Sequence, residues 1–336
     1  MSVDNHHGIV LPRHRTARFH RAHLHEALQA HVPPSTIELR KAFKSVKLDE
    51  ASDNLLLSFE DGSTARADLL LGTDGIRSAV RRQFVPDSNP KWTGWVAFRT
   101  VYDINRLKGL GDVLDEANHW WGPNRSFFSS PLGKGLFTIV GSHYSDPDAP
   151  DTPYKDATWN SEGNVDDLRP LYKDWHPAIR KMIDVAPNVR RYPNTFAPAL
   201  PSWSFLGGRV TLAGDAAHAH GGAFAAGGSS AIDDAYALSA AIWHVFPPGT
   251  SYFPSQSIAQ ALSLYENVRR PHTTKVVALV QGGNKAVVAR LQKEESEEEV
   301  LARLKNRSDP YWIHEHDVVK IFTEAVAQLE RNNSRL

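Results

Sequence analysis

Residues 208–238 combine residue types that could bind a ligand. A short apolar strand over residues 209–212 runs into Gly214-Asp215, and a loop rich in Gly and Ala leads to a helix expected to begin near Ser229. Small residues let backbone N–H groups approach a flat or anionic ligand, and the start of a helix adds a partial positive charge. Asp215 could accept hydrogen bonds from sugar-type hydroxyls. On spacing alone, a tight strand-to-helix connection without any ligand explains the pattern equally well.

A second turn, Gly72-Thr73-Asp74-Gly75, follows an apolar run over residues 67–71 and leads into the helix start IRSAVRRQF. A strand, a turn and a helix in this order make half of an α/β unit. An Asp in such a turn commonly caps the next helix, and we expect capping to account for at least half of the role of Asp74.

Several histidines raise the question of a metal site. Asp215, His218 and His220 place a carboxylate and two imidazoles close together in sequence. With 16 His residues in the chain, such proximity arises easily by chance, and no helix-borne HExxH pattern is present. We therefore predict no bound metal. The N-terminal histidines are interpreted as surface or cap residues: His6, His7, His14, His20, His23 and His25.

The elements that must position these residues follow from hydrophobic periodicity. Apolar residues at helical spacing predict a helix over residues 19–32, which Pro33-Pro34 ends. Short, alternating, aromatic segments predict an antiparallel sheet over residues 91–144, with about half of its aromatic side chains in the core. Further predicted elements are strands within residues 37–71 around an Asp61-Gly62 hairpin turn, a loop over 146–152, and helices over 165–189, 231–246 and 257–289.

Composition narrows the functional classes. The 336 residues include 38 Lys plus Arg and 38 Asp plus Glu, a balance that argues against a nucleic-acid or lipid partner. The absence of cysteine excludes thiolate nucleophiles and iron–sulfur clusters. The apolar run over 235–246 is too short to span a bilayer, and the N-terminus lacks an apolar secretory segment. We predict a cytoplasmic protein without an integral membrane segment.

Residue identities add a resemblance to a known family. The stretch GRVTLAGDAAHAHGGAFAAGG resembles the second FAD-binding motif of the FAD-dependent aromatic hydroxylases, flavoprotein monooxygenases of the salicylate hydroxylase type, with Gly214-Asp215 as its Gly-Asp pair. LLLGTDGIRSAVR resembles the Asp-Gly motif of the family, and FHRAHLHEAL resembles its His-Arg helix. Other similar segments follow in order up to about residue 271: WTGWVAFR, HWWGPNRSFFSSPL, WHPAIRKMI, LPSW and YENVRRP.

This resemblance implies FAD and NAD(P)H as cofactors. In the family, NAD(P)H reduces FAD, which then reacts with O₂ and transfers oxygen to an electron-rich ring or alkene. Asp215 would hold the ribityl or pyrophosphate side of FAD, and Gly227 and Gly228 would present amides near the isoalloxazine, where negative charge develops on reduction. No catalytic residue is assigned, because much of the chemistry belongs to the cofactor. The predicted cofactor-binding residues are Arg21, Asp74, Gly214, Asp215, Gly227 and Gly228.

The resemblance also implies an α/β (α+β) fold. We expect a shortened, Rossmann-like FAD-binding domain over residues 1–90 and 195–290, an inserted antiparallel substrate sheet over 91–194, and a helical extension over 291–336. No GxGxxG segment is found, so the sequence is expected to begin after about 100 residues of the family architecture. That loss would leave an apolar strand edge near residues 67–71, so we expect the chain either to repack there or to associate into a homo-oligomer.

Two functions remain open on this sequence. One is a FAD-dependent monooxygenase for an apolar or aromatic small molecule, in specialised (secondary) metabolism. The other is a flavin-independent cyclase or pericyclase, which needs only a shaped apolar cavity and a few hydrogen-bond donors. The second is suggested by the missing GxGxxG segment and by Gly222, which stands where relatives usually have a proline beside the flavin. The predicted substrate pocket contains Trp121, Phe128, His143, Gly222 and Phe224.

Overall fold

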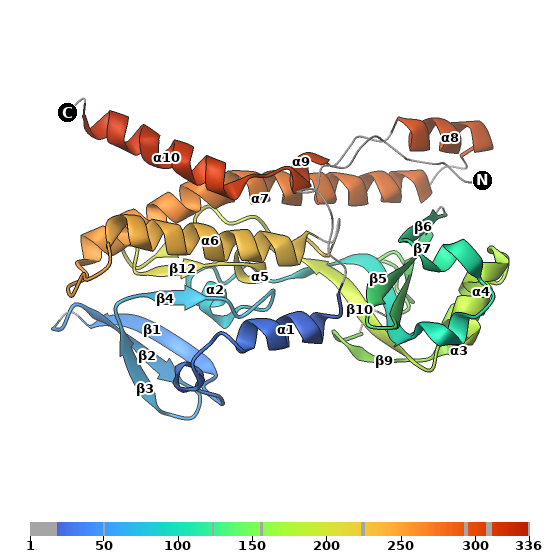
Figure 1. Ribbon diagram of the computed structural model, residues 1–336, viewed down its shortest axis with the longest axis horizontal. Coiled ribbons are helices and arrows are strands. Elements are labelled where there is room, and N and C mark those ends of the chain that lie inside the picture. The colour runs from blue at the N-terminus through green and yellow to red at the C-terminus, as the bar shows by residue number, and fades with distance from the viewer. Residues whose placement is uncertain are drawn as a thin grey trace. The chain divides into compact units, whose positions relative to one another are not determined.

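The chain divides into two compact units in a computed structural model (Figure 1). The model describes residues 19–49, 51–122, 124–154, 157–222, 226–291, 295–306 and 311–334. The first unit contains residues 1–37, 94–194 and 290–294, and the second contains residues 38–93, 195–289 and 295–336. Assignment of these units to cofactor and substrate binding stays a prediction.

The first unit is built on a six-stranded sheet in the order β6-β7-β8-β5-β10-β9. Its strands are β5 (Lys91–Asp103), β6 (Asn118–Trp121), β7 (Arg125–Gly133), β8 (Leu136–Tyr144), β9 (Ser161–Gly163) and β10 (Val189–Phe196). Strands β5, β6, β7 and β8 pair antiparallel, which confirms the aromatic sheet predicted over residues 91–144. The sequence does not predict β10, because its RRYPN segment is polar and contains a proline.

Helices α1 (Arg21–Gln29), α3 (Val165–Leu171) and α4 (Pro177–Asp184) belong to the first unit, with short 3₁₀ helices over Pro34–Thr36, Ile104–Leu107 and Gly111–Leu114. The α1 helix confirms the prediction for residues 19–32. The single helix predicted over 165–189 is wrong, because His176 precedes a proline and takes the extended conformation that this position favours. The His176 ring then caps α4 by accepting a hydrogen bond from the Ala178 N–H at 3.2 Å.

The second unit contains two three-stranded sheets. Strands β1 (Phe43–Asp49), β2 (Asn54–Phe59) and β3 (Thr64–Ala67) form an antiparallel meander, and β11 (Ser204–Phe205), β12 (Val210–Leu212) and β4 (Leu70–Gly72) form the other sheet. In that sheet β12 and β4 run parallel. The single strand predicted over residues 67–71 is divided, because Ala67 pairs with Leu55 in one sheet and Leu70 pairs with Val210 in the other.

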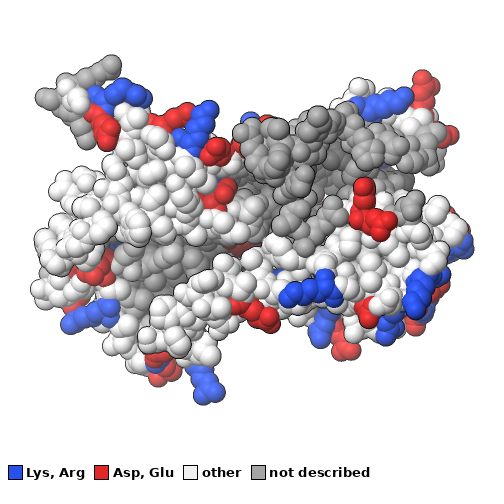
Figure 2. Space-filling view, in the orientation of Figure 1, with Lys and Arg blue, Asp and Glu red and all other residues white. Residues whose placement is uncertain are grey.

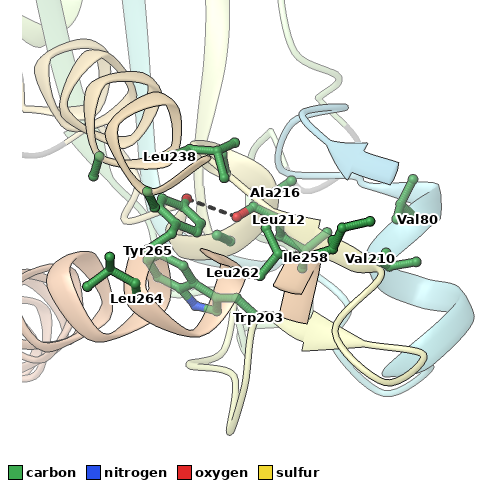
Figure 3. Packing of buried hydrophobic residues seen from close by; sticks show 14 of the residues in the cluster. Val80, Trp203, Val210, Leu212, Ala216, Leu238, Ile258, Leu262, Leu264 and Tyr265 are labelled. Carbon is green, nitrogen blue, oxygen red and sulfur yellow. Dashed lines mark hydrogen bonds between the residues drawn. The ribbon is translucent and has the colours of Figure 1, made fainter. Parts of the chain in front are cut away.

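Helices α2 (Ala79–Phe84), α5 (Asp215–His218), α6 (Gly227–Val245), α7 (Ser255–Leu291), α8 (Glu297–Lys305), α9 (Tyr311–His314) and α10 (Val318–Asn333) also belong mainly to the second unit. Apolar side chains of α6 and α7 pack against β12, and Leu212, Leu238 and Leu262 lie in this core (Figure 3). Burying one such side chain stabilises a fold by about 1.5–3 kcal/mol. Tyr265 on α7 donates a hydrogen bond to the Leu212 carbonyl at 3.0 Å and so fixes the strand that leads into Gly214.

These elements make an α/β (α+β) fold with an inserted antiparallel sheet, as the sequence predicts. Helices α6 and α7 confirm the helices predicted over 231–246 and 257–289, although α6 begins at Gly227 rather than near Ser229. None of the described helices combines the length and the apolar character needed to cross a membrane.

Candidate functional site

The Gly214-Asp215 turn follows β12 and has a backbone conformation that requires glycine. Gly214 has φ +59° and ψ −143°, a region that residues with a Cβ rarely adopt. Its N–H donates to Asp234 Oδ2 at 2.8 Å. Asp215 is exposed, and its carboxylate makes no hydrogen bond within the described part of the chain. This carboxylate is therefore available to a ligand.

The N-terminal end of α6 lies beside Asp215. Ala226, the residue before the helix, provides no side-chain cap for the first N–H groups. A Cβ added to Gly227 would lie 4.0 Å from Asp215 Oδ1 and 4.0 Å from His220 Nε2, and one added to Gly228 would meet no atom within 4 Å. The exposed carboxylate, the helix start and the two glycines thus lie together at one site.

Asp74 acts as a helix cap. Its carboxylate accepts hydrogen bonds from Ser78 Oγ at 2.5 Å and from the N–H groups of Ala79 and Val80 at 2.7 and 3.1 Å, all at the start of α2. Ser78 Oγ in turn accepts a hydrogen bond from the Arg81 N–H at 2.9 Å. The capping role predicted for Asp74 is confirmed, whereas contact between Asp74 and FAD stays a prediction.

Arg81 connects the two turns. Its buried guanidinium donates hydrogen bonds to the carbonyl of Ile76, after β4, and to the carbonyl of Ala216, after β12, the second at 2.8 Å. Burial lowers the pKa of Arg81, and the nearby Asp74 and Asp215 carboxylates oppose that shift. One buried cation therefore sets the spacing between the Asp74 turn and the Asp215 turn.

A buried charge network next to Gly214 is not predicted by the sequence. Asp234 is completely buried and accepts hydrogen bonds from His218 Nε2 at 2.7 Å and from Arg269 Nε at 2.8 Å. Burial by itself raises the pKa of Asp234, but the hydrogen bonds and positive charge of His218 and Arg269 hold it below its usual value. Arg269 Nη1 also donates to His316 Nε2 at 2.6 Å. Asp234 and Arg269 stand 35 positions apart, so no local motif reveals their pairing.

The histidines do not form a metal site within the described residues, where no group of three or more His, Asp and Glu side chains could hold an ion. His218 is hydrogen-bonded to Asp234, while Asp215 and His220 face the start of α6. Among the N-terminal histidines, His20 and His23 lie on or next to α1. His6, His7 and His14 lie outside the described residues.

The predicted pocket residues of the sheet lie on two faces. Phe128 stands opposite His119, and Trp121 follows His119 by two residues, so Trp121 and Phe128 share one face. The His119 ring lies 4.6 Å from the Trp121 ring and 5.9 Å from the Phe128 ring, measured between centroids. His143 stands opposite Arg125 and therefore points to the other face. Burial and the Arg125 charge lower the pKa of His143 there.

Three other predicted residues lie elsewhere in the chain. Arg21 begins α1 in the first unit and is exposed. Gly222 is exposed in the turn after α5 and has φ +72°. Phe224 lies outside the described residues. The roles of Arg21 and Gly222 stay predictions.

Comparisons with known proteins agree with the motifs. A family model described as "FAD binding domain" matches residues 203–280. The chain is 28% identical over 270 residues to salicylate hydroxylase of Pseudomonas putida, covering 76% of this chain and 60% of the relative. It is 30% identical over 260 residues to 3-amino-4-hydroxybenzoate 2-monooxygenase of Streptomyces cremeus, covering 76% and 59%. The chain thus spans about 60% of the length of these curated relatives.

Solved structures support the same fold. A salicylate hydroxylase substrate complex matches with a TM-score of 0.73 at 24% identity, covering 91% of this chain and 75% of the other. HpxO of Klebsiella pneumoniae, solved with FAD and uric acid, matches with a TM-score of 0.65 at 21% identity, covering 91% and 70%. In sequence, motifs and fold, the chain is thus similar to FAD-dependent aromatic hydroxylases.

Proposed function

We propose that the chain binds FAD at the N-terminal end of α6 and acts as a monooxygenase on an apolar or aromatic small molecule. The observation that carries this proposal is the convergence at Gly227 of an exposed carboxylate, a helix start and a buried imidazole. Apart from its neighbours along α6, a Cβ at position 227 or 228 would have no described atom closer than 4.0 Å, so the described residues leave room there. A cofactor with a flat polar ring and a hydroxylated chain fits such a set of groups.

Each residue of the site would have a different role in binding FAD or the substrate. FAD, when bound, supplies electron transfer from NAD(P)H and the activation of O₂. Asp215 would accept hydrogen bonds from hydroxyls of the ribityl chain, and the first N–H groups of α6 would stabilise negative charge on the ring. Arg81 would act indirectly, because it holds the Asp215 turn in place. Trp121 and Phe128 would contact an apolar substrate from their shared face of the sheet.

The relatives suggest a substrate class. Their names specify hydroxylation of salicylate, of 6-hydroxynicotinate and of 3-amino-4-hydroxybenzoate, all aromatic acids. We propose an aromatic or similarly electron-rich substrate for this chain. A role in specialised metabolism and a cytoplasmic location stay predictions from the sequence, and no observation on the described residues favours the cyclase alternative.

The spectrum of the purified full-length chain tests the proposal. We expect flavin absorbance, or its appearance on titration with FAD, and NAD(P)H oxidation that an aromatic acid such as salicylate stimulates. A colourless chain that neither binds FAD nor consumes NAD(P)H, yet converts a substrate, would overturn the proposal in favour of flavin-independent chemistry.

Substitution of Asp215 tests the site itself. Asp215→Asn removes a charged acceptor, and hydrogen bonds to charged groups contribute about 1.5–3 kcal/mol, so we expect FAD affinity to fall by about 10- to 100-fold. The matched control is Asp87→Asn, because Asp87 is also an exposed carboxylate of the second unit but does not belong to the Gly214-Asp215 turn. Equal FAD affinity of the two variants in a fluorescence titration would argue against Asp215 as a ligand.

A further inference from the structure

His220 is a buried imidazole without a hydrogen-bond partner. Only 3% of its surface is exposed, and neither Nδ1 nor Nε2 makes a hydrogen bond in the described part of the chain. A neutral imidazole has one N–H donor and one acceptor nitrogen, and buried groups of this kind are nearly always paired in folded proteins. Two unpaired nitrogens on one buried ring therefore indicate a partner that the described residues do not supply.

The backbone holds this ring in place. His220 forms an isolated antiparallel bridge with Phe196, and the adjacent Ala219 carbonyl accepts a hydrogen bond from the Ala197 N–H at 3.0 Å. Both Ala219 and the preceding His218 are buried as well. Because the backbone here is paired, the Cα of His220 has a fixed position, and the surrounding buried residues enclose its ring.

The ring faces the candidate site. Its Nε2 lies 4.0 Å from the position of a Cβ on Gly227, the same position that lies 4.0 Å from Asp215 Oδ1. His218, two residues earlier, is also buried, but its Nε2 is hydrogen-bonded to Asp234 Oδ2 at 2.7 Å. Of these two buried histidines, His220 is therefore the one whose ring nitrogens remain available to a ligand at the start of α6.

A lowered pKa favours the neutral form of the His220 ring, which can pair with uncharged polar groups of a ligand. Burial and the neighbouring His218 lower the pKa of His220, while Asp215 and a contact of the ring with its own backbone oppose that shift. That contact does not have the geometry of a hydrogen bond. A neutral His220 can donate one hydrogen bond and accept another. A planar heterocycle with an amide or imide edge offers the complementary acceptor and donor.

We infer that His220 forms a hydrogen bond with the heterocyclic ring of the ligand bound at the N-terminal end of α6. This inference rests on the proposed function, in which the ligand is FAD and the ring is its isoalloxazine. His220 is then a cofactor-contacting residue of this chain, beside Asp215 and the start of α6.

Flavin affinity tests the inference in the full chain. His220→Leu fills a similar volume without polar atoms, and we expect it to weaken binding of both FAD and riboflavin about fivefold to tenfold, as for loss of one hydrogen bond. His220→Gln keeps a donor and an acceptor and should stay within about twofold of wild type. His244→Leu, the same substitution at an exposed position on α6, should leave both affinities unchanged.

Thermal unfolding without flavin gives a second, independent readout. Because no described residue pairs with the His220 nitrogens, His220→Leu should raise the melting temperature of the flavin-free protein by a few degrees. A lower melting temperature together with unchanged flavin affinity would show that His220 is a packing residue, which overturns the inference.

The titrations distinguish failure of the proposed flavin binding from failure of the inferred His220 contact. If the wild type binds neither flavin, the proposed function fails and the inference fails with it. If the wild type binds both and His220→Leu binds them equally well, only the inference fails. A loss confined to FAD would place the contact outside the ring, because riboflavin lacks the pyrophosphate and adenosine, and would also overturn the inference.

Discussion

At the scale of single residues, the site depends on side chains whose partners lie far away in sequence. Arg81 stands on α2, and its guanidinium donates to a carbonyl 135 positions later, next to Asp215. Asp234 holds Gly214 from the opposite side through a hydrogen bond to its N–H. The Gly214-Asp215 turn is thus fixed by one buried cation and one buried anion.

Substitution of Arg81 by Met should destabilise the second unit. It would leave buried carbonyls without a donor, so we expect the free energy of unfolding to fall by about 2–4 kcal/mol. The matched control is Arg82→Met, because the neighbouring Arg82 side chain is exposed and should change stability by less than about 0.5 kcal/mol. Urea denaturation followed by circular dichroism measures both, and equal losses would contradict the role given to Arg81.

At the scale of elements, a histidine pair connects α7 with the segment between α9 and α10. The rings of His272 and His316 stack at 3.8 Å, and Arg269 donates a hydrogen bond to His316 Nε2. Burial and the positive charge of Arg269 lower the pKa of His316 to about 4, against weaker opposition from Asp317 and Asp234. Burial, with His316, Arg269, Lys275 and His218, lowers that of His272 to about 3.

This pair predicts a loss of stability in mild acid. Below the unfolded-state pKa of about 6.5, these histidines bind protons in the unfolded chain but stay neutral in the folded one. The stability that depends on the neutral pair is therefore fully present above about pH 6.5. It is lost as the pH decreases toward 4. His316→Gln can still accept the Arg269 hydrogen bond but does not titrate, so its melting temperature should fall less steeply between pH 7 and pH 4. Parallel curves for the two proteins would refute this explanation.

At the scale of the whole molecule, one helix presents apolar side chains to the outside. Ile232, Tyr236 and Trp243 lie on one face of α6, and Trp243 is 72% exposed. The surface over α6 on the face shown in Figure 2 has few charged side chains, and no exposed residue of this helix is Asp, Glu, Lys or Arg. Exposed apolar patches of this kind commonly mark contact surfaces.

Self-association, one of the two outcomes expected from the sequence, can be tested at this face. We expect the sedimentation coefficient of the wild type to rise with protein concentration and that of Trp243→Lys to rise less, because a buried Lys is costly. Trp159→Lys is the matched control, since Trp159 is also exposed but lies in the first unit. A wild type that sediments as a monomer at every concentration would show the prediction to be wrong.

Local sequence patterns predicted most of the helices and strands. Period-two aromatic alternation predicts β5 to β8, helical spacing predicts α1, α6 and α7, and the Gly-Asp turn predicts where a ligand site begins. The errors occur where a local signal is ambiguous: Pro177 divides a predicted helix, and a turn after Ala67 sends a predicted strand into two sheets. These outcomes depend on which neighbour a segment pairs with.

The sequence by itself predicted most of the element types, the resemblance to FAD-dependent aromatic hydroxylases and the capping role of Asp74, because each depends on residues near one another in the chain. The tertiary structure decided the rest of the site. It paired Asp234 with Arg269, separated His143 from Trp121 and Phe128 across a sheet, and left His220 buried without a partner. Those facts depend on contacts between distant segments and on the exclusion of water, which no local spacing can specify.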